Sequence, residues 1–258
     1  MGTTHFHSDR ASLRLIRRKQ KCNLCDTQLL CQETWRDRVV MRDVSTLIQS
    51  KGPYETGERI YKIQDQFKSL FIIKSGIVKV EKVDNDGNSH ISGFYFPGDV
   101  IGLESIGDEQ YNYNAIALEK TWVCEIRLDR LEPLGQSIIA VQQTIIKLLG
   151  KRVHQADDML TRGRYLSSEQ RLLVFFEMLC KRYFIQTIDS KKKLHLPMSK
   201  VDIASYLGMR PESVSRALRN LQNQGVIQNH LKTIEIKDLN VAKKMICKSR
   251  WGLLRDKC

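Results

Sequence analysis

The sequence predicts an α+β fold: a β sandwich or barrel, then one long helix, then a small helical domain. Three observations support this prediction. Short apolar runs separated by turn residues occupy the region from Val40 to Leu131. A helical apolar periodicity begins near residue 136, and two short helical segments separated by Gly208 follow it. With 41% hydrophobic and 28% charged residues, the chain of 258 residues has the composition of an ordinary globular protein.

Residues 1–35 form a predicted N-terminal arm that is rich in basic residues and carries three cysteines. Cys22, Cys25 and Cys31 follow the spacing C-x2-C-x5-C. Three thiolates this close together can bind one side of a zinc ion or of an iron–sulfur cluster, and a fourth ligand must then come from elsewhere. Cys124, in the predicted strand TWVCEI, is the candidate for that ligand. On this pattern zinc, an iron–sulfur cluster and thiol oxidation all remain open.

The other cysteines and the charge limit the class of protein. Seven cysteines, an odd number, and no expected secretory signal or membrane span argue against a disulfide framework and for a cytoplasmic protein. Cys180 lies in an apolar helical segment and is interpreted as a core residue, whereas Cys247 and Cys258 have no partner spacing. The net charge of +13 favours a polyanionic partner, with double-stranded DNA first and an anionic membrane surface second.

Residues 36–135 are the predicted β domain. The segments RIYKI, SLFIIKSG, IVKVEKV, HISGFYF and NAIAL have the composition of short strands. Turn residues at 84–88 and 97–99 separate some of them.

Residues 136–165 form a predicted long helix with an apolar stripe. A stripe of this length can pack on a second copy of the chain, or it can pack on the β domain of its own chain. We favour the homodimer because the stripe continues without interruption. The predicted dimer interface consists of Ile145, Leu149, Val153, Ala156 and Leu160.

Residues 166–240 contain a predicted helix-turn-helix, and residues 241–258 a basic tail. Ser199 suits a helix N-cap, and Asp202 suits the positive end of that helix. Gly208 suits the left-handed position that ends it, and Pro211 suits the first turn of the next helix. The following segment VIQNHLKTIEI is a predicted β wing.

One face of the second helix has the side chains that read DNA. Arginine can bind guanine O6 and N7 together, and glutamate can accept a hydrogen bond from cytosine. The alternative is a solvated face with a Glu–Arg pair. Glu212, Ser215, Arg216 and Arg219 form this face, and Arg219, Lys232, Lys237 and the tail are candidate phosphate contacts.

Together these motifs resemble the CRP/FNR superfamily of bacterial transcription regulators, and within it the fumarate and nitrate reduction regulator branch. The resemblance covers about residues 20–240. It rests on the four cysteines, on the phrases ETGERIY, LFIIKSGIVKV and GFYFPGDVIG, and on Glu212-x-x-Ser215-Arg216. It implies a β-roll of the cyclic-nucleotide-binding jelly-roll type, a dimerisation helix and a C-terminal winged helix-turn-helix.

The resemblance also implies a function. Cys22, Cys25, Cys31 and Cys124 would hold a 4Fe-4S cluster that oxygen converts to 2Fe-2S. The cluster would favour a homodimer that binds a palindrome with TTGAT-like half-sites and activates or represses genes of anaerobic metabolism. Exposed loops of the β-roll and of the DNA-binding domain would contact RNA polymerase, with residues 84–88 as one candidate surface. No catalytic activity is expected.

Two departures from the family pattern stand out. Gln64-Asp65 occupies a turn where the family usually has Gly-Asp. Asp157 and Asp158 point off the apolar stripe, and Ala156 lies on it, which predicts a dimer that depends less on the cluster.

The sequence argues against two other classes of protein. A cyclic-nucleotide-responsive regulator would need a cation for the ligand phosphate, and the segment from Asp99 to Leu118 has no Lys or Arg. An iron–sulfur enzyme or electron carrier would leave the helix-turn-helix without a purpose, and the sequence shows neither a nucleophile–base pair nor a second cluster motif.

Overall fold

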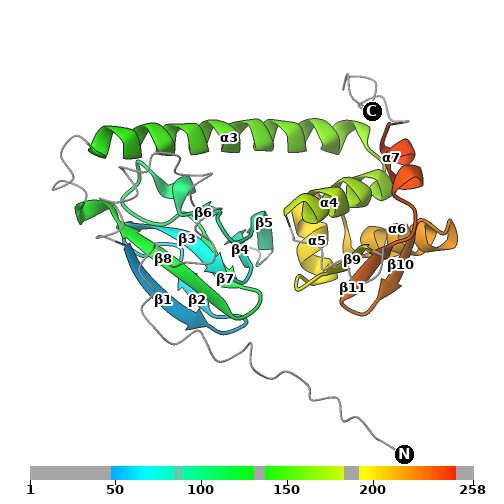
Figure 1. Cartoon of the computed structure of the whole chain (residues 1–258), viewed down its shortest axis with the longest axis horizontal. Helices are drawn as coiled ribbons and strands as arrows, with labels where there is room; N and C mark the ends of the chain where they lie inside the picture. The colour runs from blue at the N-terminus through cyan, green and yellow to red at the C-terminus, as the bar shows by residue number, and fades with distance from the viewer. Residues whose placement is uncertain (1–47, 85–86, 88, 131–136, 183–191, 248–258) are drawn as a thin grey trace, which may run out of the picture.

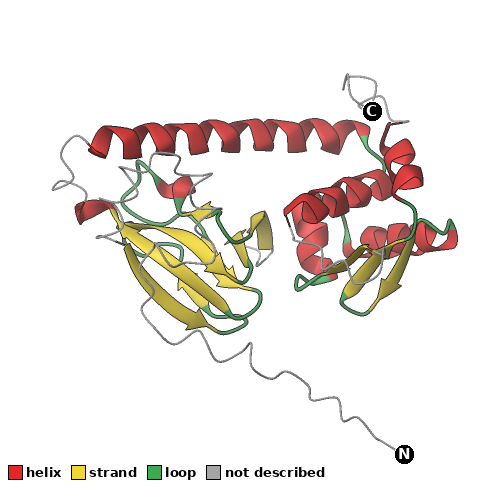
Figure 2. Cartoon of the chain, viewed as in Figure 1, coloured by secondary structure: helices red, strands yellow, loops and turns green. Residues whose placement is uncertain are grey.

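The computed structural model describes residues 48–84, 87, 89–130, 137–182 and 192–247. Strands dominate the N-terminal part, and helices with one small sheet make up the C-terminal part (Figure 2). The long helix α3 (Ser137–Tyr165) runs alongside both parts (Figure 1). The architecture confirms the predicted α+β fold.

Two four-stranded antiparallel sheets form the β-roll, in the orders β1-β8-β3-β6 and β2-β7-β4-β5. Phe71, Ile73, Val80 and Val123 are buried in one apolar cluster to which both sheets contribute. The strands are β1 (Ile48–Tyr54), β2 (Arg59–Tyr61), β3 (Ser69–Ser75), β4 (Val78–Val83), β5 (Ser89–Tyr95), β6 (Val100–Ile101), β7 (Asn114–Ala117) and β8 (Thr121–Arg127), and the short 3-10 helices are η3 (Leu103–Ser105) and η4 (Leu128–Arg130).

The turn after β2 contains Gln64, at the position where the family usually has glycine. Gln64 has a φ of 70°, in the left-handed region that favours glycine. Its backbone N–H donates to the carbonyl of Tyr111 (2.9 Å), and Asp65 accepts from the N–H of Lys62 (2.9 Å). These hydrogen bonds hold a conformation that costs a non-glycine residue about 1 kcal/mol or more.

The C-terminal part packs helices around a three-stranded sheet of order β10-β11-β9. Its elements are α4 (Ser168–Arg182), β9 (Lys192–His195), α5 (Lys200–Leu207), α6 (Pro211–Asn223), β10 (Ile227–His230), β11 (Thr233–Ile236) and α7 (Leu239–Cys247). Ala242 and Ile246 of α7 are buried in the core of this part. Helix α7 crosses residue 240, where the sequence analysis places the start of the basic tail.

The two parts share one apolar core. Ile91 and Phe94 of β5 lie in the same buried cluster as Phe175 of α4 and Leu218 of α6. The ring of Phe94 lies 5.9 Å from that of Phe175 and 5.2 Å from that of Tyr206 on α5, measured between ring centroids. The contact between the two parts is therefore packed like a protein interior rather than like a flexible joint.

Candidate functional site

The helix-turn-helix is built from local signals that the sequence contains. Ser199 caps α5: its side chain accepts from the N–H of Asp202 (3.0 Å), and the Asp202 carboxylate accepts from the N–H of Ser199 (2.8 Å). Gly208 ends the helix with a φ of 61°. Pro211 then opens α6, where its missing N–H leaves no hydrogen bond unmade. Helix α5 therefore begins and ends, and α6 begins, where the sequence predicts.

Helix α6 presents its predicted reading face to solvent. Val214, Ala217, Leu218 and Leu221 are buried on the opposite side. On the reading face Glu212, Arg216 and Arg219 are exposed, and Ser215 is half-buried. A carboxylate, a hydroxyl and two guanidinium groups thus share one accessible helix face, as base-edge contacts in a major groove require.

A hydrogen bond between helices fixes the orientation of α6. Asn220 donates from Nδ2 to the Oε1 atom of Glu169 on α4 at 2.9 Å. This hydrogen bond is the main cause that lowers the pKa of Glu169, and the positive charge of Arg216 adds a smaller effect. Sequence reasoning missed both Glu169 and Asn220, because no local pattern pairs a residue of α4 with one of α6.

The predicted wing is a β-hairpin in which a two-residue loop joins β10 to β11. Leu231 at its tip is fully exposed, and Lys232 beside it is exposed too. Lys237, a predicted phosphate contact, has its Nζ atom 2.8 Å from the carboxylate of Glu235. Of these two lysines, Lys232 is therefore the better candidate for a phosphate contact.

Only one of the four predicted metal ligands lies in the described part of the chain. Cys22, Cys25 and Cys31 fall outside the described residues. Cys124 is half-buried on β8, the strand between β1 and β3, and it packs against the cluster of Leu70, Ile72 and Ile126. A thiol that is partly exposed and anchored on an interior strand fits the role of a fixed ligand.

Cys124 also lies next to the long helix. Ile145, Leu148 and Leu149 of α3 pack against the same apolar cluster as Cys124. Cys180, which the sequence assigns to the core, is half-buried against the shared core of the two parts. Among the described residues, no three or more His, Cys, Asp or Glu side chains gather into a group that could hold a metal.

The apolar stripe of α3 divides between two faces. Ile145 and Leu149, two of the predicted dimer residues, pack on the β-roll of their own chain, whereas Val153, Ala156 and Leu160 are exposed. An outer stripe with a strict spacing of seven runs along the exposed face: Ile139, Ile146, Val153 and Leu160, with exposed fractions of 56, 66, 71 and 68%. The sequence prediction missed Ile139 and Ile146, which a search for heptads would have found.

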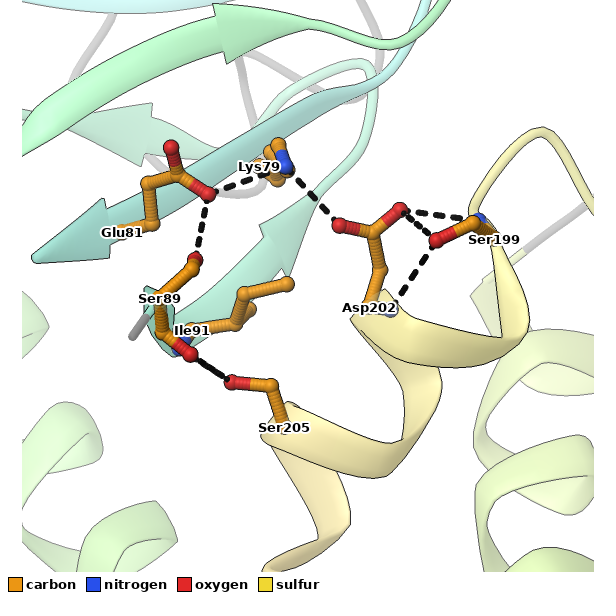
Figure 3. A network of polar contacts seen from close by, with 7 residues as sticks. All are labelled: Lys79, Glu81, Ser89, Ile91, Ser199, Asp202 and Ser205. Carbon is orange, nitrogen blue, oxygen red and sulfur yellow. Dashed lines mark hydrogen bonds and ion pairs between the residues drawn. The ribbon is translucent and has the colours of Figure 1, made fainter. Parts of the chain in front are cut away.

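A polar network joins the β-roll to the helix-turn-helix (Figure 3). Lys79 on β4 contacts Asp202 of α5 (2.8 Å) and Glu81 (2.9 Å), and its side chain is only 17% exposed. Burial opposes the charged form of Lys79, but the hydrogen bonds to Asp202 and Glu81 outweigh it and raise the pKa of the amine. A charge on the second domain thus satisfies a half-buried charge on the first.

The same contact covers an exposed sheet edge. Strand β5 is the last strand of its sheet, so part of its backbone lacks a neighbouring strand. Ser205 on α5 uses one hydroxyl for two of these groups: it accepts from the N–H of Ile91 (3.0 Å) and donates to the carbonyl of Ser89 (2.6 Å) (Figure 3). Helix α5 therefore acts as a cap on the sheet edge.

The segment between Asp99 and Leu118, where a cyclic nucleotide phosphate would need a cation, carries an acid whose carboxyl group is buried. Glu104 accepts a hydrogen bond from the hydroxyl of Tyr61, and burial raises the pKa of its carboxyl group. A buried carboxyl without a basic residue in this segment does not favour an anionic ligand.

Comparison with known families identifies both parts. Residues 51–137 match the cyclic nucleotide-binding domain, and residues 170–241 match the Crp-like helix-turn-helix domain. The described part of the chain has no helix with the length and apolar character needed to cross a bilayer.

Relatives that match most of the chain are found among bacterial regulators. The anaerobic regulatory protein of Haemophilus influenzae is 31% identical over 219 residues, which cover 85% of each chain. The fumarate and nitrate reduction regulatory protein of Escherichia coli strain K12 is 30% identical over 231 residues, which cover 87% of this chain and 92% of that protein. The structure of FixK2 from Bradyrhizobium japonicum superimposes with a TM-score of 0.66 at 26% identity, covering 77% of this chain and 96% of the other.

Proposed function

Because the chain belongs to the CRP/FNR family of transcription regulators, we propose that it is an oxygen-responsive regulator of anaerobic metabolism that binds DNA as a cytoplasmic homodimer. The observation that carries the proposal is the exposed reading face of α6, in a chain whose relatives include an anaerobic regulatory protein and a fumarate and nitrate reduction regulatory protein.

The DNA contact follows from the chemistry of the reading face. Arg216 would donate to guanine O6 and N7, Glu212 would accept from the amino group of cytosine, and Ser215 would bond either. Arg219 and Lys232 would bind phosphates and set the register. The target in this proposal is a palindrome with TTGAT-like half-sites, one for each recognition helix of the dimer.

Arg216→Ala tests this contact. We expect affinity for a TTGAT palindrome to fall by about 1–3 kcal/mol per base contact, with relaxed preference at one base pair. Arg219→Ala is the matched control and should weaken all sequences about equally. Gel-shift titrations on specific and mutated sites measure both. If Arg216→Ala lowered the affinity for all sequences equally, Arg216 would contact only phosphate.

The signal in this proposal enters at four cysteines: Cys22, Cys25, Cys31 and Cys124. A 4Fe-4S cluster bound there would supply an oxygen-sensitive group, which oxygen converts to 2Fe-2S. Cys124 would anchor that group on a fixed strand, and the arm carrying the other three would supply the remaining ligands. Cys124 and residues of α3 pack against the same apolar side chains of the β-roll. Loss of the iron–sulfur cluster at Cys124 would therefore take place beside the dimerisation helix.

The iron content decides between a cluster and structural zinc. Anaerobically purified protein should be brown, lose its visible absorbance in air, and contain about four iron and four sulfide per chain. Cys124→Ala should keep the fold, judged by circular dichroism, and lose the iron, whereas Cys180→Ala should keep both. A colourless protein that holds only zinc would disprove the cluster and leave the DNA-binding proposal standing.

The remaining partners are proposed on the same basis. RNA polymerase would be contacted through loops that include residues 84–88, most of which lie outside the described residues. No cyclic nucleotide is expected as a ligand, because the segment from Asp99 to Leu118 offers the buried Glu104 and no cation. A regulator of this kind has no catalytic step.

A further inference from the structure

A small cavity lies where the β-roll, α3 and α4 meet. It measures about 60 Å³, and its lining includes Tyr95 and Asp99 of the β-roll, Lys151 and Arg152 of α3, and Arg182 of α4. Of the ten residues that line it, three are cationic and one is anionic. The volume is far below the ~300–1,000 Å³ of pockets for drug-sized ligands, so the cavity suits a small charged group.

The positive charge in this cavity is only partly neutralised. Asp99 is already engaged: its Oδ2 atom accepts from Nη1 of Arg182 (2.8 Å) and from the N–H of Phe96 (3.0 Å). The guanidinium carbon of Arg152 lies 4.3 Å from the centroid of the Tyr95 ring, and no described carboxylate forms an ion pair with it. Burial, with the nearby charge of Arg182, lowers the pKa of Arg152 to about 10.

Such an arrangement is costly without an anion. At neutral pH Arg152 remains protonated, so a half-buried cation faces a second cation, and no described carboxylate pairs with it. Arginine forks match the oxygens of a phosphate group, and lysine adds a mobile charge at the rim.

We infer that the cavity between the β-roll, α3 and α4 is a binding site for a small phosphate-like dianion, held by Lys151, Arg152 and Arg182. These cations lie outside residues 51–137, the part that matches the cyclic nucleotide-binding domain. Because Lys151 and Arg152 belong to α3 and Arg182 belongs to α4, a bound dianion joins the long helix to the DNA-binding part.

Calorimetric titration of the full chain, purified anaerobically and free of DNA, tests the inference. Inorganic phosphate is one probe and glycerol phosphate the other, with sodium chloride holding the ionic strength constant. The expected result is one saturable site per chain for at least one probe. Binding of both, or of inorganic phosphate alone, identifies free phosphate as a sufficient ligand, whereas binding of the ester alone identifies a phosphate ester. Absence of saturable binding for both overturns the inference.

Single-charge variants separate this cavity from the general basic surface. Arg152→Gln and Lys151→Gln should each weaken binding roughly 10-fold or more, because each removes a hydrogen bond to a charged group. Lys147→Gln removes an equally positive, exposed side chain of α3 outside the cavity and should leave binding unchanged. Lys151 is itself exposed, so its variant tests the site even if Arg152→Gln does not fold. Equal weakening by Lys147→Gln would show diffuse surface binding and overturn the site.

Discussion

Val141 and Val153 are the same residue type on the same helix, yet their surroundings are opposite. Val141 is 1% exposed and packs in a cluster with Leu70 and Ile126 of the β-roll, whereas Val153 is 71% exposed. The difference shows that the apolar pattern of α3 serves two purposes. One face completes the core of its own chain, and the outer stripe (Ile139, Ile146, Val153 and Leu160) remains exposed for another surface.

The spacing of the outer stripe indicates what that surface is. Apolar residues exactly seven positions apart meet a second helix in a left-handed coiled coil. Exposed apolar side chains in such a row mark an interaction site rather than a solvated face. In our proposal the second helix is the α3 of another copy. Substitutions on the inner face of α3 should then affect folding, and substitutions on its outer face should affect dimerisation.

The largest expected effect is on the outer face. Val153→Glu should place two like charges in the dimer seam and weaken dimerisation by about 3 kcal/mol or more, roughly 100-fold. Affinity for a palindrome should fall with it, while the unfolding free energy of the monomer stays within about 0.5 kcal/mol. Sedimentation velocity at several concentrations measures this. His154→Glu, one residue away on the exposed surface, is the control, and a dimer unaffected by Val153→Glu would exclude this seam.

A substitution on the face of α3 that packs on the β-roll should affect stability and leave dimerisation unchanged. Val141→Ala removes buried methyl groups and should lower the unfolding free energy by about 1–3 kcal/mol without changing the dimer dissociation constant of the folded protein. Urea unfolding at fixed protein concentration checks the first part, and sedimentation checks the second. If Val141→Ala weakened dimerisation as much as Val153→Glu, the two faces would not be independent.

A smaller effect is expected at the polar network between the two parts. Lys79→Met leaves Asp202 and Glu81 without their shared cation and should destabilise the chain by about 1–3 kcal/mol. Lys82→Met removes an exposed lysine from the same strand and serves as the control. Differential scanning calorimetry of the two variants measures the loss. Equal melting temperatures would mean that the Lys79 contacts add no stability to the contact between the two parts.

The smallest effect is the pH dependence of this contact. Burial opposes the charged form of Asp202, but hydrogen bonds from Lys79 and Ser199 outweigh it and lower the pKa of the carboxyl group. A carboxyl with a lowered folded-state pKa contributes stability above its unfolded pKa of about 4, and this stability is lost as the pH falls through the folded value.

Urea unfolding between pH 6 and pH 3 should therefore show a steeper loss for the wild type than for Asp202→Asn. Lys79, whose pKa is raised, contributes below its unfolded pKa of about 10 and loses that contribution as the pH rises further. If the unfolding free energies of the wild type and of Asp202→Asn fell equally between pH 6 and pH 3, this ion pair would add no stability.

Local signals made much of the DNA-binding element predictable. The cap at Ser199, the left-handed Gly208 and the first-turn Pro211 act within a few residues, so their effect can be read without the rest of the fold. The strand β9 was not predictable in this way. It forms because Leu194 pairs with Ile234 of β11, whereas the sequence around it shows mainly lysines.

The contacts between the two parts were beyond prediction for a different reason. Lys79 and Asp202 are 123 positions apart, and neither belongs to a motif that names a partner. The contact of Ser205 with the edge of β5 was equally unpredictable, because a serine on a helix surface carries no signal for a distant sheet edge.

By itself, therefore, the sequence determined the order of the two folded parts, the turn between the two helices of the helix-turn-helix, the residues on the exposed face of α6 and the apolar character of α3. All of these rest on periodicities and caps that act over at most a few turns. Only the tertiary structure decided which face of α3 covers the β-roll, that Cys124 lies beside that helix, and that Lys79 and Arg182 link the parts. Those outcomes depend on the packing of surfaces far apart in the chain, where shape and burial, not local pattern, select the partner.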